Sequence, residues 1–243
     1  MSSPQHSSSP VGSGEPPYPV HLAAVPPGEL SRWLWLLKWL LIIPHVVVLV
    51  FLWLAFVVLT FIALIAIVAT GTYPRGIFDF NVGVLRWTWR VSYYSYSALA
   101  TDEYPPFTLG EVAGYPASFS VDYPERLSRG LALVKWWLLA IPHYLVIGLL
   151  VGPQVGWQDV DGTRYEGQIG LIGILVLVAA LVLTFTGRYP RSVFDLLLGF
   201  NRWIYRVSGY AGLMTDVYPP FRLDQGGPDP DAPGGTTGPP ATD

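Results

Sequence analysis

Two histidines lie where an ionisable side chain could carry out chemistry in apolar surroundings. His45 and His143 each follow a proline inside a long apolar run. Such a pair could relay protons or bind a metal ion. However, two histidines without neighbouring carboxylates or thiolates make a weak metal site, and a proline leaves a backbone carbonyl free to accept a hydrogen bond. The pattern therefore favours an interhelical hydrogen bond for His45 and His143, and we assign no metal ligand.

Two aspartates could act as a catalytic carboxylate pair. Asp102 lies in the motif TDEYPPF and Asp216 in TDVYPPF. An aspartate in such a Pro-rich segment most often caps a turn. The sequence contains no cysteine and no GxSxG, HExxH, CxxC or glycine-rich phosphate loop, so no motif supplies a nucleophile or a metal cluster beside them. We assign no catalytic residue and expect no cofactor.

A third set of polar residues recurs at helical spacing. Its two copies are Arg75, Asp79, Gly83, Arg86 and Arg90, and Arg191, Asp195, Gly199, Arg202 and Arg206. These positions fall on one face of an α-helix, and apolar and aromatic residues occupy the opposite flank. A helix of this kind lies in the plane of a membrane, with its arginines against lipid phosphates.

Six arginines of these helices are therefore candidates for binding an anionic lipid headgroup or an acidic protein surface. They are Arg75, Arg86, Arg90, Arg191, Arg202 and Arg206. Asp79 and Asp195 follow the first arginine of each set by four residues, which is the spacing of a stabilising ion pair within a helix. The alternative is that these helices only anchor the protein at the membrane surface.

The duplicated motifs belong to an internal repeat that spans most of the chain. The blocks that align without a gap are 18–32 with 115–129, 70–92 with 186–208, and 98–109 with 212–223. A fourth block aligns 36–45 with 133–143, with one extra residue in the second copy. Four blocks in the same order predict two copies of one structural unit. The second copy also carries a polar, glycine-rich insertion at 152–168.

The composition places the chain among membrane proteins. Apolar residues make up 51% of the chain and charged residues only 13%, and the mean hydropathy is +0.41. Soluble domains carry about 25% charged residues. The basic residues flank apolar runs instead of forming a basic surface on a soluble domain, so nucleic-acid binding is not expected.

The apolar runs predict four membrane spans arranged as two helical hairpins. In the second copy, spans at about 130–151 and 169–186 flank an outer loop at 152–168. In the first copy, two spans are expected within 31–71, joined by a tight turn near 51–55, because one helix would be too long for a hydrocarbon core of about 30 Å. This arrangement places every basic residue except Arg164 on one side, which the positive-inside rule assigns to the cytoplasm. Both termini are then cytoplasmic, and Lys38 and Lys135 are expected to extend to that surface.

The predicted fold class is an all-α membrane protein with two tandem parallel repeats. Each repeat contains a transmembrane helical hairpin, an amphipathic interfacial helix and short extended arms, at 18–24, 107–109, 115–121 and 221–223, which could pair between copies. The predicted domains are a disordered tail at 1–17, repeat 1 at 18–109 with an interfacial helix at about 75–99, repeat 2 at 115–223 with an interfacial helix at about 191–213, and a disordered tail at 224–243.

The paired motifs KWLLIIPH/KWWLLAIPH, TGxYPRxxFD, RWxxRVS and TDxYPPF resemble a bacterial family of membrane proteins, chiefly actinobacterial, that is catalogued as a domain of unknown function. The resemblance covers about residues 18–223, in two copies. It implies a small polytopic protein of the inner (plasma) membrane. It implies no activity, so no catalytic residue is carried over.

Three functional hypotheses follow. The first is a non-enzymatic membrane module that binds lipids, anionic ones included, or a protein partner in an envelope assembly or homo-oligomer. The second is a small oligomeric transporter or channel that uses His45 and His143. The third is a lipid-modifying enzyme that uses Asp102 or Asp216. The repeated basic helices, together with the lack of a nucleophile or metal set in the sequence, favour the first.

Overall fold

The computed structural model describes residues 17–152, 154–158, 164–168 and 170–230, so residues 1–16 and 231–243 of the tails predicted at 1–17 and 224–243 lie outside these ranges. The described chain is mostly helical, with two small two-stranded sheets. The first copy contains β1 (Val20–Ala24), α1 (Leu34–Leu41), α2 (Ile43–Thr70) and α3 (Arg75–Tyr94). The second contains β2 (Ala117–Val121), α4 (Arg129–Val134), the π-helical segment η1 (Lys135–Leu139), α5 (Ile141–Val151), β3 (Gln154–Gln158), β4 (Arg164–Gln168), α6 (Leu171–Thr186) and α7 (Arg191–Ala211).

Proline and glycine set the ends of the longest helix. Pro44 falls in the first turn of α2, where its missing N–H and fixed φ are tolerated. α2 then runs for 28 residues and ends at Gly71, whose φ of +79° glycine adopts without strain. Gly187 ends α6 in the same way, with a φ of +70°.

The tight turn predicted near 51–55 is wrong, because α2 continues without a break through these residues. The segment Phe51–Ala55 contains no proline or glycine that would stop a helix. The first copy therefore holds one long helix, roughly 42 Å in length at about 1.5 Å per residue, and no hairpin forms there.

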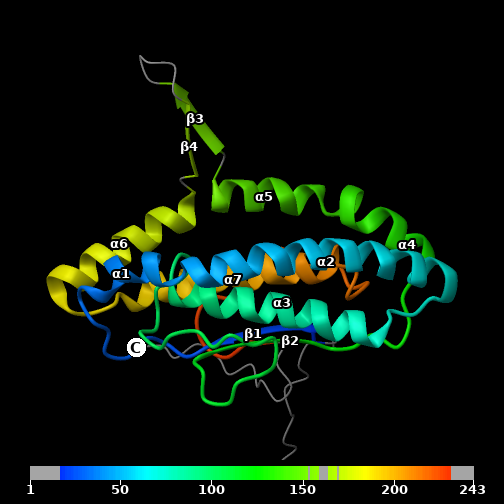
Figure 1. Ribbon diagram of the computed structural model, residues 1–243, viewed down its shortest axis with the longest axis horizontal. Helices are drawn as coiled ribbons and strands as arrows, with labels where there is room; N and C mark the ends of the chain where they lie inside the picture. Colours follow the sequence, from blue (N-terminus) through cyan, green and yellow to red (C-terminus); the bar gives the residue numbers. More distant parts are fainter. Residues whose placement is uncertain (1–16, 153, 159–163, 169, 231–243) are drawn as a thin grey trace, which may run out of the picture.

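The second copy explains why the comparison between copies suggested a hairpin. α5 has 11 residues and α6 has 16, so together with Gly170 they match the 28 residues of α2. The insertion interrupts what is a single helix in the first copy, and its two ends lie in contact. α6 continues in the direction of α5 (Figure 1), so the transmembrane hairpin predicted for the second copy is also wrong. A Cβ atom on Gly170 would lie 2.1 Å from the carbonyl carbon of Val151. β3 and β4 pair antiparallel and extend away from the helices (Figure 1).

Two helical stretches are long and apolar enough to cross a membrane. They are Ile43–Thr70, with 28 residues, and Arg129–Val151, with 23 residues. α6 is apolar but shorter. Only 17% and 22% of the most apolar segments of the two long stretches are buried, so most of their side chains face outward.

The helices form two layers, and a β-ribbon covers the second (Figure 1). α2, α4–α5 and α6 form an outer layer that packs on α3 and α7. The ribbon forms from the arms predicted at 18–24 and 115–121, whereas the described residues 107–109 and 221–223 contain no strand. Leu22 of β1 lies opposite Phe119 of β2, and these residues hold the same position in the two copies. A pseudo-twofold axis therefore passes between them.

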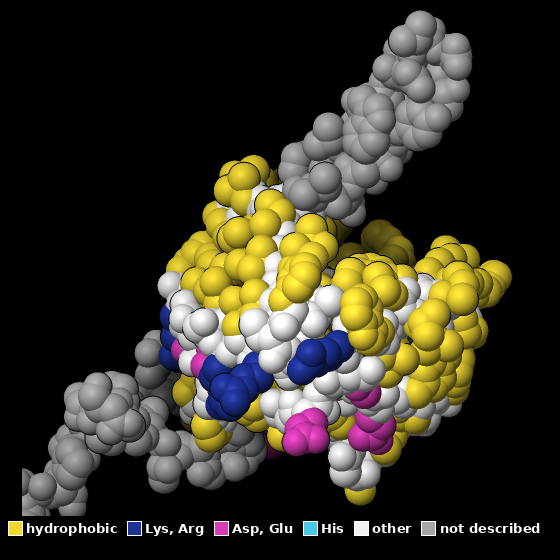
Figure 2. Space-filling view, turned by 90° about the vertical axis from the view of Figure 1, so that its left-hand side faces the viewer, with side chains coloured by type: hydrophobic (Ala, Val, Ile, Leu, Met, Phe, Trp, Pro, Cys, Tyr) yellow, Lys and Arg dark blue, Asp and Glu magenta, His cyan; other side chains and the backbone are white. Residues whose placement is uncertain are grey.

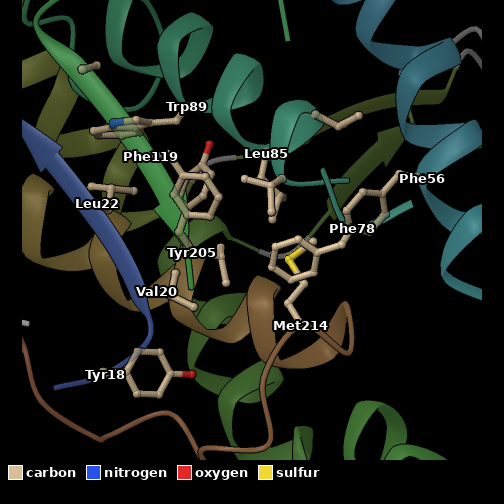
Figure 3. Close-up of a cluster of buried hydrophobic side chains, with 14 of the residues drawn as sticks. Tyr18, Val20, Leu22, Phe56, Phe78, Leu85, Trp89, Phe119, Tyr205 and Met214 are labelled. Atoms are coloured by element: carbon tan, nitrogen blue, oxygen red, sulfur yellow. The ribbon is translucent and has the colours of Figure 1, made fainter. Parts of the chain in front are cut away.

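The largest core of the protein lies at this axis and joins the two copies. β1 packs on α7 of the second copy, and β2 packs on α3 of the first. Figure 3 shows Leu22 and Phe119 beside Trp89 of α3 and Tyr205 of α7. The Tyr205 ring lies 5.6 Å from the Trp89 ring and 5.4 Å from the Phe119 ring, measured between centroids. Burial of each such side chain stabilises the folded protein by about 1.5–3 kcal/mol. Because this core takes residues from both copies, neither copy has a complete core alone.

The disordered tail predicted from residue 224 begins too early. Residues 224–230 are described and pack on the protein. Asp229 is only 2% exposed, and its Oδ2 accepts a hydrogen bond of 2.8 Å from the backbone N–H of Leu22. The composition of this segment is typical of a solvated chain, but its acidic side chains and carbonyls bind buried arginines.

Removal of residues 152–169 is expected to join α5 and α6 into one helix like α2, because Val151 and Gly170 already lie in contact. The shortened protein should keep its helical content and melt within about 4 °C of the parent, a change of roughly 1 kcal/mol for this size. Circular dichroism during heating in detergent would measure both quantities. Gly170→Val in the full chain is the control and should lower the melting temperature by more. Loss of the folded state on deletion would contradict the equivalence of α2 with α5 and α6.

Candidate functional site

Each copy contains a buried lysine paired with the aspartate of its TDxYPPF motif. Lys38 Nζ lies 2.8 Å from Asp102 Oδ1, and Lys135 Nζ lies 2.8 Å from Asp216 Oδ1. Each ammonium group also donates to the backbone carbonyl of the threonine that precedes its aspartate, at 2.6 and 2.8 Å. The lysine side chains are 2% and 0% exposed, so the prediction that they extend to the cytoplasmic surface is wrong.

The second oxygen of each aspartate holds the arm before the lysine helix. Asp102 Oδ2 accepts a hydrogen bond from the backbone N–H of Ser31, and Asp216 Oδ2 accepts one from that of Ser128, both at 2.6 Å. Each carboxylate thus joins an arm, a helix and its own loop. Because both oxygens are engaged, this geometry supports the structural role expected for Asp102 and Asp216 over a catalytic one.

His45 lies in an aromatic cage formed by residues from its own copy. Its Nδ1 accepts a hydrogen bond of 3.1 Å from Trp87 Nε1 of α3. Its ring stacks on Phe107, with 3.9 Å between ring centroids, and the Tyr104 ring lies at 4.9 Å. Tyr104 in turn donates its hydroxyl to the carbonyl of Leu41, next to the kink before α2. An interhelical hydrogen bond is present as expected, but His45 accepts it from an indole and does not donate to the carbonyl that Pro44 frees.

His143 repeats this arrangement in the second copy. Its Nδ1 accepts a hydrogen bond of 3.0 Å from Trp203 Nε1 of α7, and its ring stacks on Phe221 at 4.3 Å. The Tyr218 ring lies at 5.0 Å, and its hydroxyl donates to the carbonyl of Leu139. Each histidine is fully buried within its own cage.

The hydrogen-bond pattern fixes the tautomer of both histidines. An indole N–H can only donate, so Nδ1 must be the acceptor and the neutral ring carries its hydrogen on Nε2. Both Nε2 atoms are buried without a hydrogen-bond partner among the described residues. Within that same part of the chain, no group of three or more histidine and acidic side chains is placed to hold a metal ion.

The π-helical segment keeps the two sites equivalent despite the extra residue in the second copy. One more residue separates Lys135 from His143 than separates Lys38 from His45. In the first copy the Ile42 N–H bonds to the Lys38 carbonyl, four residues back, at 3.0 Å. In the second, the Ala140 N–H bonds to the Lys135 carbonyl, five residues back, also at 3.0 Å. One wide turn thus absorbs the insertion, as π-bulges do, and both side chains reach their partners.

Arg86 and Arg202 face the β-ribbon instead of a membrane surface. Arg86 Nε donates to the carbonyl of Phe119 at 2.8 Å, and Arg202 Nε donates to that of Leu22 at 3.2 Å. Each arginine therefore clamps the central residue of the strand that belongs to the other copy. Arg202 also donates to three carbonyls in the segment 224–227, at 2.8–2.9 Å.

Arg90 and Arg206 are buried next to them, each only 1% exposed. Arg90 donates to the carbonyl of Gly110, while Arg206 forms ion pairs with Asp224 at 2.5 Å and Asp229 at 3.3 Å. Burial lowers the pKa of Arg90 because the charged guanidinium loses water, and its neighbour Arg86 lowers it further. The polar stripe of α3 and α7 is thus largely an internal surface, which differs from the exposed, membrane-facing stripe that the spacing predicted.

The first arginine of each stripe is exposed. Arg75 pairs with Asp79 and Arg191 pairs with Asp195, both at 3.3 Å and four residues apart, as predicted. The Arg75 guanidinium also lies 4.4 Å from the centre of the Tyr123 ring. Binding of an anionic lipid or a partner stays a prediction, and these two arginines are the members of the set that remain at the surface.

The partners of the lysines and the histidines were not predicted. The repeat itself carried the signal: a lysine, an aspartate, a histidine and a tryptophan recur in both copies within three of the paired motifs. An unpaired buried charge is costly, so two lysines in apolar runs required two carboxylates. Two pairs of aspartates recur, and since Asp79 and Asp195 already had arginines four residues away, Asp102 and Asp216 were left for the lysines.

Comparison with known proteins gives a family but no activity. A family model described as Domain of unknown function (DUF4389) matches residues 32–108 and 168–222. The first segment contains Lys38, His45 and the complete first site, and the second contains α6, α7 and the second TDxYPPF motif up to Arg222. Two matched segments are consistent with a duplicated family of unknown function. A search of curated proteins and a search of solved structures gave no match.

The Lys38–Asp102 pair is expected to show strong energetic coupling. Lys38→Met or Asp102→Asn alone leaves an unpaired, largely buried charge and should lower the free energy of unfolding by about 2–4 kcal/mol. The double variant should lose less than the sum of the two, with a coupling of roughly 1–3 kcal/mol. Denaturant unfolding in detergent measures all three.

The exposed Arg75–Asp79 pair provides the matched control, with an expected coupling below about 0.5 kcal/mol. The Lys135→Met and Asp216→Asn cycle should repeat the result of the first copy. Strictly additive effects at both buried pairs would contradict the structural role assigned to them.

Proposed function

The chain belongs to the family described as Domain of unknown function (DUF4389), and on that premise we propose that it is an integral membrane protein that interacts with lipids and catalyses no reaction. The observation that supports the membrane is the outer layer. Phe51, Leu54 and Ile65 of α2 are 65–71% exposed, and Phe185 of α6 is 81% exposed. Exposed apolar surface on this scale is typical of contact with a partner or a membrane.

The distribution of charge also supports contact between the outer layer and a membrane. Figure 2 shows one end of the molecule, where hydrophobic side chains cover the upper part and charged side chains lie below them. The outer layer would contact acyl chains, while α3, α7 and the β-ribbon would lie on the side of water. By the positive-inside rule, this water-facing layer, with Arg75 and Arg191, would lie on the cytoplasmic side of a bacterial inner membrane.

The non-enzymatic role is supported by the engagement of the acidic groups. Asp102 and Asp216 hold lysines and backbone N–H groups, and Asp224 and Asp229 both hold the buried Arg206. These carboxylates complete internal ion pairs, so they would have to leave their partners to accept a proton from a substrate. Within the proposal, the exposed arginines contact lipid phosphates at the edge of the apolar layer.

The absence of cysteine from the sequence allows a direct test of membrane contact with single-cysteine variants. Phe51→Cys and Ile65→Cys should react slowly with a charged maleimide in intact membrane vesicles, because lipid covers α2. Glu125→Cys, on the exposed connection between β2 and α4, should react quickly. Detergent should remove the difference. Equal labelling rates at all three positions in intact vesicles would rule out the proposed orientation.

Reversal of the exposed arginines should weaken binding of anionic lipid. Each arginine near such a surface contributes about 1 kcal/mol, so the Arg75→Glu, Arg191→Glu double variant should lose at least about tenfold in affinity for phosphatidylglycerol. Binding of zwitterionic phosphatidylcholine should not change. Native mass spectrometry of the protein in detergent, with each lipid added, gives both affinities. Unchanged binding of phosphatidylglycerol by the folded double variant would exclude these arginines as its site.

A further inference from the structure

Two neighbouring chambers lie beneath the outer helices. The first has a volume of about 430 Å³ and lies between α2 and the η1–α5 stretch, with α7 as its floor. The second has a volume of about 510 Å³ and lies between α2 and the start of α6, with α3 and α7 as its floor. Trp53, Ile204 and Ser208 line both, so the chambers adjoin. Each volume falls within the range of ligand sites, about 300–1,000 Å³.

The chambers differ in chemistry. The first is lined almost entirely by apolar and aromatic side chains, among them Phe61, Trp136 and Ile147. The second, at the centre of the protein, contains hydroxyl and amide groups, among them Ser97 and Asn201. Ser97 donates its hydroxyl to Asn201 Oδ1, so this polar pair is already ordered. Among the described residues that line the two chambers, none is charged.

The pseudo-twofold axis relates the first chamber to a differently divided space in the other half of the molecule. Gly173, Leu177 and Trp39 occupy the repeat positions of Val57, Phe61 and Trp136, and they line a third hollow of only about 60 Å³. Ile172, Thr88 and Ser92 occupy those of Phe56, Ile204 and Ser208, and they line the central chamber. The space equivalent to the first chamber is therefore shared between the small hollow and the central chamber.

Two aromatic residues that the first chamber lacks narrow the third hollow. Trp35 lines the closed hollow, and the equivalent residue of the second copy is Ala132. Tyr96 also lines it, and this residue lies in a connection that is two residues longer than its counterpart in the second copy. Protein interiors are close-packed, so a largely apolar chamber of about 430 Å³ beside the central chamber points to an occupant.

We propose that the two adjoining chambers bind one amphipathic lipid with an uncharged head. Its chain occupies the apolar chamber between α2 and α5, and its hydroxyl-bearing head lies in the central chamber, where Ser97 Oγ can accept a hydrogen bond. Asn201 positions this oxygen, because its Oδ1 accepts the Ser97 hydroxyl while its Nδ2 donates to the carbonyls of Ser97 and Leu197. The absence of charged residues from the described lining disfavours a phosphate or ammonium head there, because a charge without a partner is costly in apolar surroundings. This inference rests on the proposed lipid interaction and specifies a ligand distinct from the anionic lipids at the exposed arginines.

Photocrosslinking of the full chain in nanodiscs tests the inference. The probe is a monoacylglycerol with a diazirine in its acyl chain, and peptide mapping should find the label on residues of the apolar chamber. Ile147→Trp fills that chamber and should reduce the chamber label by roughly tenfold, which corresponds to a tenfold weaker affinity. Leu145→Trp is the matched control, because it places the same side chain on the outer face of α5, where Leu145 is 68% exposed. It should leave the chamber label unchanged.

The head chamber is tested with Asn201→Leu, since leucine is the residue at the equivalent position 85 of the first copy. This variant should reduce labelling by the monoacylglycerol probe and leave labelling by a diazirine-bearing hydrocarbon unchanged. Both filling variants should melt within about 4 °C of the parent, which shows that they fold.

Three results would overturn the inference. They are a chamber label that Ile147→Trp does not reduce, a label found only on the outer surface, and equal chamber labelling by a phosphatidylglycerol probe. A protein that enters the bilayer and binds phosphatidylglycerol at its arginines, yet gives any of these results, would disprove this site and leave the proposed function standing.

Discussion

The exchange of arms between the two copies is the constraint on which the rest of the structure depends. β1 of the first copy lies on α7 of the second, and β2 lies on α3 of the first. Arg86 and Arg202 fix this exchange, since each donates to the central carbonyl of the strand from the other copy. Because a guanidinium loses solvation when buried, several carbonyls must converge on it, and these carbonyls come from distant parts of the chain. The segment 224–230, which resembles a free tail, is ordered for this reason.

The buried pairs at the outer helices then set the register of each half. A lysine within an apolar helix can bind its aspartate only if the helix keeps the correct phase, and the histidine about two turns later must face its tryptophan. The single extra residue in the second copy would rotate one of these groups away by about 100° in an α-helix of 3.6 residues per turn. The π-helical turn at Lys135–Leu139 removes that rotation locally. Polar pairing thus explains a deviation from regular helix geometry.

Local patterns in the sequence predicted the repeat, the amphipathic helices at Arg75 and Arg191, their ion pairs and the strands of the ribbon. Two errors have physical causes. The hairpin in the first copy was inferred from the length of the apolar run and the placement of the basic residues, although no proline or glycine lies at 51–55 to form a turn. The arginine stripe was assigned to a membrane surface because helical spacing identifies a face but not what covers it. The cover consists of strands and a tail far away in sequence, which no local pattern reports.

The pseudo-twofold axis between Leu22 and Phe119 has a consequence for how such a chain can diverge. A single repeat with this architecture would meet an identical copy through the same arms, and its folding would depend on concentration. Covalent linkage replaces that association by a fixed effective concentration within one chain. It also allows the two halves to differ in sequence, so that Trp35 narrows a hollow in one half while the equivalent residue of the other half is Ala132. A protein with one asymmetric binding site can thereby arise from a symmetric, duplicated fold.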